Sequence, residues 1–150
     1  MPELPEIEIV KRSLFKMINK AKIVDIKIEN KNLRYEVPKN MVKELVNKKI
    51  LKISRRSKYL IFHFKKKLLL AHLGMSGKLL LMRNSDNAIF KTSFYYDLNI
   101  LTKHNHIYFI LDNGLVLIYN DVRRFGFFKL FENIKLKEII CLKKTWPRTF

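Results

Sequence analysis

The feature that most constrains the fold is a series of short apolar segments separated by turn residues. They occupy residues 50–54, 59–64, 68–73, 78–82, 106–111, 115–119 and 126–131. Segments of this length that end in turn residues are typical of antiparallel strands. Two of them flank Asp112-Asn113-Gly114, where an Asn-Gly pair tolerates the positive φ of a tight hairpin. The pattern therefore predicts a fold built mostly from β-hairpins.

Helices are predicted only near the start of the chain. In segment 5–20, apolar residues recur at three- and four-residue steps, namely Ile7, Val10, Leu14 and Ile18. Segment 21–28 predicts a strand with an irregular register near Val24, and segment 38–47 a second, short helix. The polar segment 85–103 predicts a loop. We therefore expect an α+β, mostly β, fold: a β-sandwich of about eight strands flanked by two helices.

Charge points to a polyanionic partner. The 150 residues, enough for one domain, include 31 Lys and Arg against 13 Asp and Glu, a net charge of +18. Lysine runs such as 65–67 are also simply solvated in many proteins. The single cysteine, Cys141, excludes a disulfide scaffold and a multi-cysteine zinc site within this chain. No apolar run predicts a membrane span and no signal peptide is visible, so we expect a cytoplasmic protein.

The amino terminus can supply a nucleophile. Removal of Met1 leaves Pro2 as a free secondary amine, which can attack an electrophilic sugar carbon and form a Schiff-base-type intermediate. Such an amine has a pKa of about 7.7–8.0 in unstructured peptides. Glu3 beside it can transfer protons as a general acid and base. The structural alternative is ordinary, because prolines often begin helices and acidic residues favour the first helical turn.

Two further segments carry candidate functional side chains. Lys58, in segment 55–59 between two predicted strands, can bind a phosphate or assist an elimination, or it can be a solvated strand end. Met75 lies between two glycines in segment 72–77, in a turn that can direct it outward as a wedge between bases. The alternative is a turn whose methionine folds back into the core.

Segment 121–126 places an arginine and an aromatic residue beside a glycine. Arg123 and Phe125 can together enter a DNA duplex and stack there. The alternative is a polar hairpin corner in which Phe125 is buried. Each candidate is weak when it is taken alone.

Together and in this order, five separated segments closely resemble the formamidopyrimidine-DNA glycosylase family, bacterial enzymes that remove oxidised purines such as 8-oxoguanine. These segments are residues 2–8, 56–60, 72–77, 103–106 and 123–126. The resemblance covers about residues 1–142. It implies a β-sandwich flanked by two helices, in agreement with the pattern of apolar residues.

The resemblance also implies residue roles. Pro2 is the expected nucleophile on C1′ of the damaged nucleotide, Glu3 the acid and base, and Lys58 a phosphate contact that assists β-elimination. Glu6 is expected to support the active site. The expected DNA-binding residues are His72, Met75, His104, Arg123, Arg124 and Phe125. Of these, Met75, Arg123 and Phe125 would fill the gap left by the extruded nucleotide.

The domain organisation is expected to be that of a truncated member. Residues 1–132 would form the catalytic domain, and residues 133–150 the start of an interdomain linker. Full-length members continue into a helix–two-turn–helix and a zinc finger, which we do not expect in this chain, and we therefore expect no metal or other cofactor here. One possible nucleotide sequence for residues 145–150 encodes Leu-Gly-Pro-Glu-Pro when the reading frame is moved by one base. Family members typically have Leu-Gly-Pro-Glu-Pro at this point. This pattern predicts a frameshifted tail.

The expected function is removal of oxidised purines with AP-lyase activity, through a Schiff base on the N-terminal proline. The expected partner is double-stranded DNA with oxidised purines or abasic sites. We expect the protein to act as a monomer and not to bind a membrane. Two alternatives stay open. One is a truncated fragment that binds DNA only by charge, and the other, supported by composition alone, is an RNA-binding or ribosome-associated module.

Overall fold

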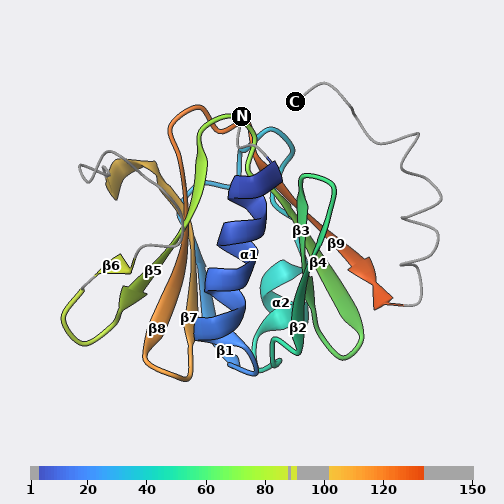
Figure 1. Cartoon of the computed structure of the whole chain (residues 1–150), viewed down its shortest axis with the longest axis vertical. Helices are drawn as coiled ribbons and strands as arrows, with labels where there is room; N and C mark the ends of the chain where they lie inside the picture. Colours follow the sequence, from blue (N-terminus) through green and yellow to red (C-terminus); the bar gives the residue numbers. More distant parts are fainter. Residues whose placement is uncertain (1–3, 88, 91–101, 134–150) are drawn as a thin grey trace.

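The computed structural model describes residues 4–87, 89–90 and 102–133 (Figure 1). In chain order the elements are α1 (Leu4–Ile18), β1 (Ile23–Ile28), α2 (Met41–Leu45), β2 (Lys52–Arg56), β3 (Tyr59–His63), β4 (Lys67–His72), β5 (Gly77–Arg83), β6 (Ile89–Phe90), the 3₁₀ turn η1 (Thr102–His104), β7 (Asn105–Leu111), β8 (Leu115–Asp121) and β9 (Phe127–Glu132). The predicted β-sandwich with two helices is confirmed. The two-residue β6 is the one addition to the predicted eight strands among the described residues.

The strands form two antiparallel sheets. One sheet has the order β1-β7-β8-β5-β6, and the other has the order β2-β3-β4-β9. In the view of Figure 1 the two sheets lie on either side of α1. The predicted apolar stripe of α1 is buried, with Ile7, Val10, Leu14 and Ile18 each at most 2% exposed. It joins one core cluster with inward side chains of both sheets, such as Phe62 on β3 and Phe109 on β7.

Three local predictions can be compared with the structure. The register of β1 shifts between Ile23 and Asp25, which confirms the irregularity predicted near Val24. In the β7–β8 turn only Gly114 has a positive φ, at +84°, so the expected turn is formed with a single left-handed residue. Segment 85–103, predicted as a loop, contains β6 and the first residues of η1; residues 88 and 91–101 lie outside the described residues.

The antiparallel pairing brings several connections to one end of the sandwich. Tyr59 pairs with His72 and His72 with Phe127 in the four-stranded sheet, while Gly77 pairs with Asp121 in the other. The β2–β3 turn, the β4–β5 loop and the β8–β9 loop therefore share this end. In Figure 1 the N-terminal end of α1 lies beside them. None of the described helices is long and apolar enough to cross a membrane.

Candidate nucleic-acid interface

Two loops meet at this end, residues 73–76 between β4 and β5 and residues 122–126 between β8 and β9; we call them the tip loops. Their backbones touch, because a Cβ added to Gly74 would lie 2.7 Å from both the Gly126 nitrogen and the Phe125 carbonyl carbon. Gly74 also has a φ of +65°. Only glycine meets both demands without strain, so this residue sets how closely the tip loops approach.

Among the exposed side chains of the tip loops, Met75, Arg123 and Phe125 lie close together; we call these three the wedge cluster. Met75 is 47% exposed and Phe125 is 40% exposed, which places both outside the core. Arg123 Nη1 lies 3.9 Å from the Met75 sulfur, and its guanidinium carbon lies 5.9 Å from the centre of the Phe125 ring. The cluster thus combines two apolar groups with one cation that contacts both.

Beneath the wedge cluster lies Asp121, which is fully buried at the end of β8. Its Oδ1 accepts a hydrogen bond from the Ser76 hydroxyl at 2.5 Å and one from the Arg123 backbone N–H at 3.2 Å. These two bonds join one tip loop to the other. The sequence alone assigns no role to Asp121 within segment 121–126, because its partner Ser76 is 45 positions away in the chain.

His72, predicted to bind DNA, is only 4% exposed. Its ring is stacked on Phe127 at 5.4 Å, and its Nδ1 accepts a hydrogen bond from the Gly74 N–H at 3.0 Å. Burial, with smaller contributions from the cations of Lys58 and Arg34, lowers the pKa of His72 to about 4. The ring is therefore neutral at pH 7, and in this structure it supports the β4–β5 tip loop.

Lys58 lies in the two-residue turn between β2 and β3. The preceding residue, Ser57, has a φ of +53°, and its carbonyl accepts a hydrogen bond from Arg55 Nη1 at 2.9 Å. The next residue, Tyr59, pairs with His72 on β4. Lys58 is half-buried beside the tip loops, as its effect on the pKa of His72 also indicates.

A basic and aromatic pair that sequence reasoning missed, Arg34 and Tyr35, also reaches this end. The backbone N–H of Arg34 donates to the Gly126 carbonyl at 3.3 Å, and the Tyr35 ring meets the Phe127 ring edge-on at 5.0 Å. Lys129 Nζ lies 4.3 Å from the centre of the Tyr35 ring. The adjacent arginine and tyrosine were the available signal, but they lie in a polar stretch without periodicity.

The other predicted site residues are distributed around these loops. Glu6 is exposed in the first turn of α1, and His104 is half-buried in η1, directly before β7. Arg124 is exposed in a tip loop with a φ of +57°. Pro2 and Glu3, the predicted nucleophile and acid, lie outside the described residues and directly precede α1 in the chain.

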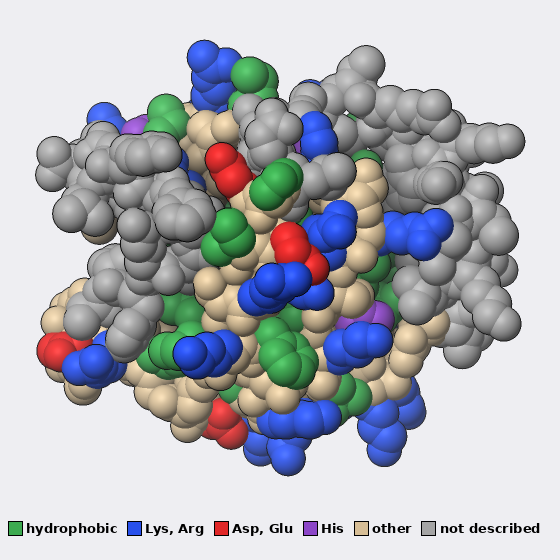
Figure 2. All heavy atoms as spheres, viewed as in Figure 1, with side chains coloured by type: hydrophobic (Ala, Val, Ile, Leu, Met, Phe, Trp, Pro, Cys, Tyr) green, Lys and Arg blue, Asp and Glu red, His purple; other side chains and the backbone are tan. Residues whose placement is uncertain are grey.

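Charge on the surface is mainly basic. On the face shown in Figure 2, Lys and Arg side chains are spread widely and acidic side chains are few, as the net charge of +18 requires. In the part of the chain that the structure describes, no group of three or more His, Cys, Asp or Glu side chains could hold a metal ion.

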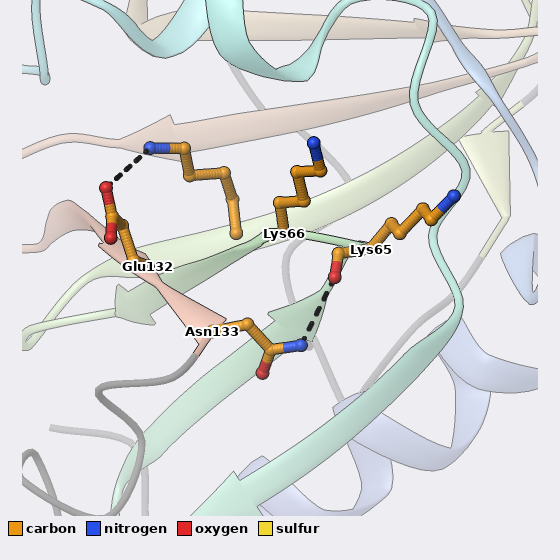
Figure 3. A pocket seen from close by; sticks show the side chains of 5 residues that line it. Lys65, Lys66, Glu132 and Asn133 are labelled. Atoms are coloured by element: carbon orange, nitrogen blue, oxygen red, sulfur yellow. Dashed lines mark hydrogen bonds and ion pairs between the residues drawn. The ribbon is translucent and has the colours of Figure 1, made fainter.

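A hollow of about 540 Å³ lies at the opposite end of β4 and β9, lined by Lys65, Lys66, Lys67, Glu132 and Asn133 (Figure 3). Lys67 forms an ion pair with Glu132 at 3.7 Å, and the Asn133 side chain donates to the Lys65 carbonyl at 3.3 Å. Since β4 runs from Lys67 to His72, the length of the strand separates this hollow from the tip loops. It is therefore not part of the candidate interface.

Comparison with known proteins gives one consistent result. The model of the family "Formamidopyrimidine-DNA glycosylase N-terminal domain" matches residues 1–128. The chain is 42% identical over 151 residues to formamidopyrimidine-DNA glycosylase of Bartonella tribocorum, covering 96% of this chain and 50% of the relative. It is 36% identical over 149 residues to the Streptococcus agalactiae protein of the same name, covering 98% of this chain and 49% of the relative.

Solved structures agree with the sequence matches. The complex of Lactococcus lactis Fpg with DNA containing an abasic site is similar, with a TM-score of 0.78 and 34% identity, covering 95% of this chain and 49% of that chain. A complex of inhibited LlFpg with DNA containing N7-benzyl-Fapy-dG has the same TM-score with 35% identity, over 95% of this chain and 48% of that chain. This chain thus spans about half the length of the curated relatives it matches. By sequence and by fold, it belongs to the formamidopyrimidine-DNA glycosylase family.

Proposed function

We propose that this chain is the catalytic N-terminal part of a base-excision-repair glycosylase with AP-lyase activity. Its substrate is double-stranded DNA that contains oxidised purines, formamidopyrimidines or abasic sites. The observation that carries the proposal is the exposed wedge cluster, at the end of the molecule where α1 begins directly after Pro2 and Glu3. Residues 1–132 form this catalytic part, and residues 133–150 begin the linker to the rest of the family architecture.

The chemistry begins at the nitrogen of Pro2. Its lone pair forms a bond to C1′ of the damaged nucleotide, the glycosidic bond breaks, and the base leaves with the bonding electrons and a proton. Opening of the sugar ring then gives an iminium, and Glu3 moves the protons that these steps require. Loss of a C2′ proton expels the 3′ phosphate, and Lys58 stabilises the charge on this phosphate. Glu6, in the first turn of α1, supports the two N-terminal residues.

The wedge cluster makes C1′ accessible. A glycosidic bond inside the duplex is shielded by stacking, so the nucleotide must be extruded at a cost of a few kcal/mol. Met75 and Phe125 enter the stack in its place, and Arg123 contacts the orphaned base. Because both apolar side chains are already exposed in the free protein, no core packing is lost when they insert.

The basic surface supplies binding that does not depend on sequence. Lys and Arg side chains replace condensed counterions on the phosphates, which makes the affinity depend steeply on salt. Lys58, His104 and Arg124 are the proposed phosphate contacts, while His72 acts through the loop it supports. We propose a cytoplasmic monomer that needs no cofactor within this chain.

Borohydride trapping tests the proposal. The protein is incubated with a duplex containing an abasic site, one containing 8-oxoguanine, or an undamaged one, in the presence of borohydride, which reduces an iminium to a stable amine. We expect a covalent complex with the first two duplexes only. In a control variant, the residue before Pro2 is one that is not removed after synthesis. The Pro2 nitrogen then stays in a peptide bond, and the covalent complex should not form. Pro5→Ala, at an exposed position three residues later, is the matched control.

The other possible outcomes separate the alternatives. If no complex is trapped while salt-sensitive duplex binding persists, the chain is a DNA-binding fragment without catalysis. If it binds single-stranded RNA more tightly than damaged duplex, it is an RNA-binding module. Either result would overturn the proposed function.

A further inference from the structure

The Asp121 carboxylate, at the end of β8, accepts hydrogen bonds from three different segments. Besides the Ser76 hydroxyl and the Arg123 N–H on Oδ1, its Oδ2 accepts from the Tyr119 hydroxyl and, at 3.0 Å, from the Gly126 N–H. An ionised carboxylate has about four acceptor positions, and here four donors use them. Hydrogen bonds of this kind stabilise a buried charge that has no ion pair among the described residues.

These bonds determine where the wedge cluster lies. Ser76 directly follows Met75, and its hydroxyl oxygen also accepts from the Arg123 N–H at 3.1 Å. Gly126 directly follows Phe125. Each member of the wedge cluster is therefore bonded to Asp121 through its own backbone or through the next residue in the chain.

The Asp121 backbone is held as well. The buried His106 on β7 donates from Nε2 to the Asp121 carbonyl at 2.7 Å. The carboxylate thus projects from a fixed position in the five-stranded sheet toward both tip loops. It is 0% exposed, so it does not reach bound DNA itself.

We infer that Asp121 is the positioning residue that aligns the wedge cluster for insertion into damaged duplex DNA. The inference rests on the proposed function, because alignment matters only if the cluster enters a duplex. Its specific consequence is that Asp121 is needed for reaction with duplex substrate and is dispensable for reaction at an abasic site in a single strand. There, no stacked partner has to be displaced.

The substitution Asp121→Asn probes this role with little change in shape. It replaces one acceptor oxygen with an NH₂ group, which can only donate. A hydroxyl donor such as Ser76 or Tyr119 can rotate and become an acceptor, but a backbone N–H cannot. Either the Arg123 N–H or the Gly126 N–H therefore loses its carboxylate partner, and the β8–β9 tip loop, which contains both, is held less firmly.

The experiment measures trapping rates on a duplex and on a single strand that both contain an abasic site. We expect Asp121→Asn to lower the duplex rate about 10- to 100-fold, the range that a misplacement of about 1 Å causes, while the single-strand rate stays within about threefold. Ser76→Ala should lower the duplex-to-single-strand ratio in the same direction by a smaller factor. Asp112→Asn, in the β7–β8 turn at the other end of β8 from Asp121, is the matched control and should leave the ratio unchanged.

A second readout keeps the test decisive. The fluorescence of 2-aminopurine opposite the abasic site rises when the wedge cluster unstacks it, and this signal needs no chemistry. The inference is wrong if Asp121→Asn and Ser76→Ala both keep the wild-type duplex-to-single-strand ratio of trapping rates and the wild-type fluorescence. It is also wrong if both variants lower the duplex rate and the single-strand rate by the same factor. If Asp121→Asn does not fold, the duplex-to-single-strand ratios of Ser76→Ala and Tyr119→Phe test the inference in its place. If the wild-type protein traps neither substrate, the proposed function fails instead.

Discussion

Arg55 Nε lies 3.6 Å from a carboxylate oxygen of Glu8, and this contact joins β2 to α1. The same guanidinium donates from Nη1 to the Ser57 carbonyl at 2.9 Å. One side chain therefore ties the turn that carries Lys58 to the helix that begins directly after Pro2. The planar guanidinium can make both contacts at once, which a lysine ammonium at the same position cannot do with the same geometry.

Removal of this link should weaken both stability and reaction. We expect Arg55→Ala to lower the free energy of unfolding by about 1 kcal/mol, since the pair is partly exposed, and to slow trapping on an abasic duplex. Arg55→Lys should restore little of the trapping rate. Arg12→Ala is the control, because Arg12 also approaches Glu8, at 3.9 Å, but is 76% exposed. Equal losses in Arg55→Ala and Arg12→Ala, measured by urea unfolding, would contradict the structural role of Arg55.

Gly74 should be intolerant of a side chain. Gly74→Ala must overcome both a left-handed φ and a Cβ position 2.7 Å from the opposing backbone. We expect a loss of about 2–5 kcal/mol in the free energy of unfolding, the sum of the two costs. Gly114→Ala meets the φ penalty alone, because nothing lies within 4 Å of its added Cβ, so about 1–2 kcal/mol is expected. Equal losses in the two variants would show that the tip loops do not pack as described.

The pKa of His72 predicts a pH-dependent stability. Burial lowers it from the ordinary 6.5 to about 4, so between these values the unfolded chain binds a proton that the folded protein excludes. The free energy of unfolding should therefore fall as the pH is lowered from about 6.5 to about 4, by up to about 1.4 kcal/mol per pH unit from this residue. His72→Gln should show a shallower slope over this window. His63, whose pKa is also lowered by burial, is present in both proteins, so its contribution cancels.

An NMR titration checks the same point directly. The ring signals of His72 should show no titration above about pH 5 in the folded protein. A His72 titration centred near 6.5 would mean that the ring is exposed and available as a cation.

Phosphate contacts should appear in the salt dependence of duplex binding. Lys58→Ala and Arg124→Ala should each reduce the slope of log K against log salt concentration by about 0.9, the value for one phosphate contact. Lys65→Ala removes the same charge at the opposite end of the four-stranded sheet and should leave the slope unchanged. If all three variants change the slope equally, binding is diffuse and the interface is not confined to the tip-loop end.

Much of the fold follows from local pattern. The stripe of α1 could be predicted because it depends on burial of one face of one helix. The long strands could be predicted because each is a short apolar segment between turn residues, and β8 is buried at all of its positions. β6 and η1 were missed, since two or three residues are too few to show a period. The β7–β8 turn was located by Asn113-Gly114, but its exact conformation depends on both strands.

In the candidate site, too, some residues are indicated by the local sequence and others only by contacts in the folded chain. Met75 and Phe125 could be proposed from the sequence because each lies beside a glycine in a turn, and Arg123 because it lies two residues before Phe125. Asp121 and Arg55 were not, because their roles depend on contacts between segments far apart in the chain, such as Asp121 with Ser76. The burial of His72 was also hidden, because it depends on stacking with β9.

The most direct test of the account is the position of the DNA adduct after borohydride trapping. Trypsin cleaves after Lys11, so the adduct can be mapped by mass spectrometry on the peptide of residues 2–11. The account predicts a reduced sugar attached to the Pro2 nitrogen of a peptide that lacks Met1. An adduct on a lysine such as Lys58, or a trapped protein that still carries Met1, would contradict it.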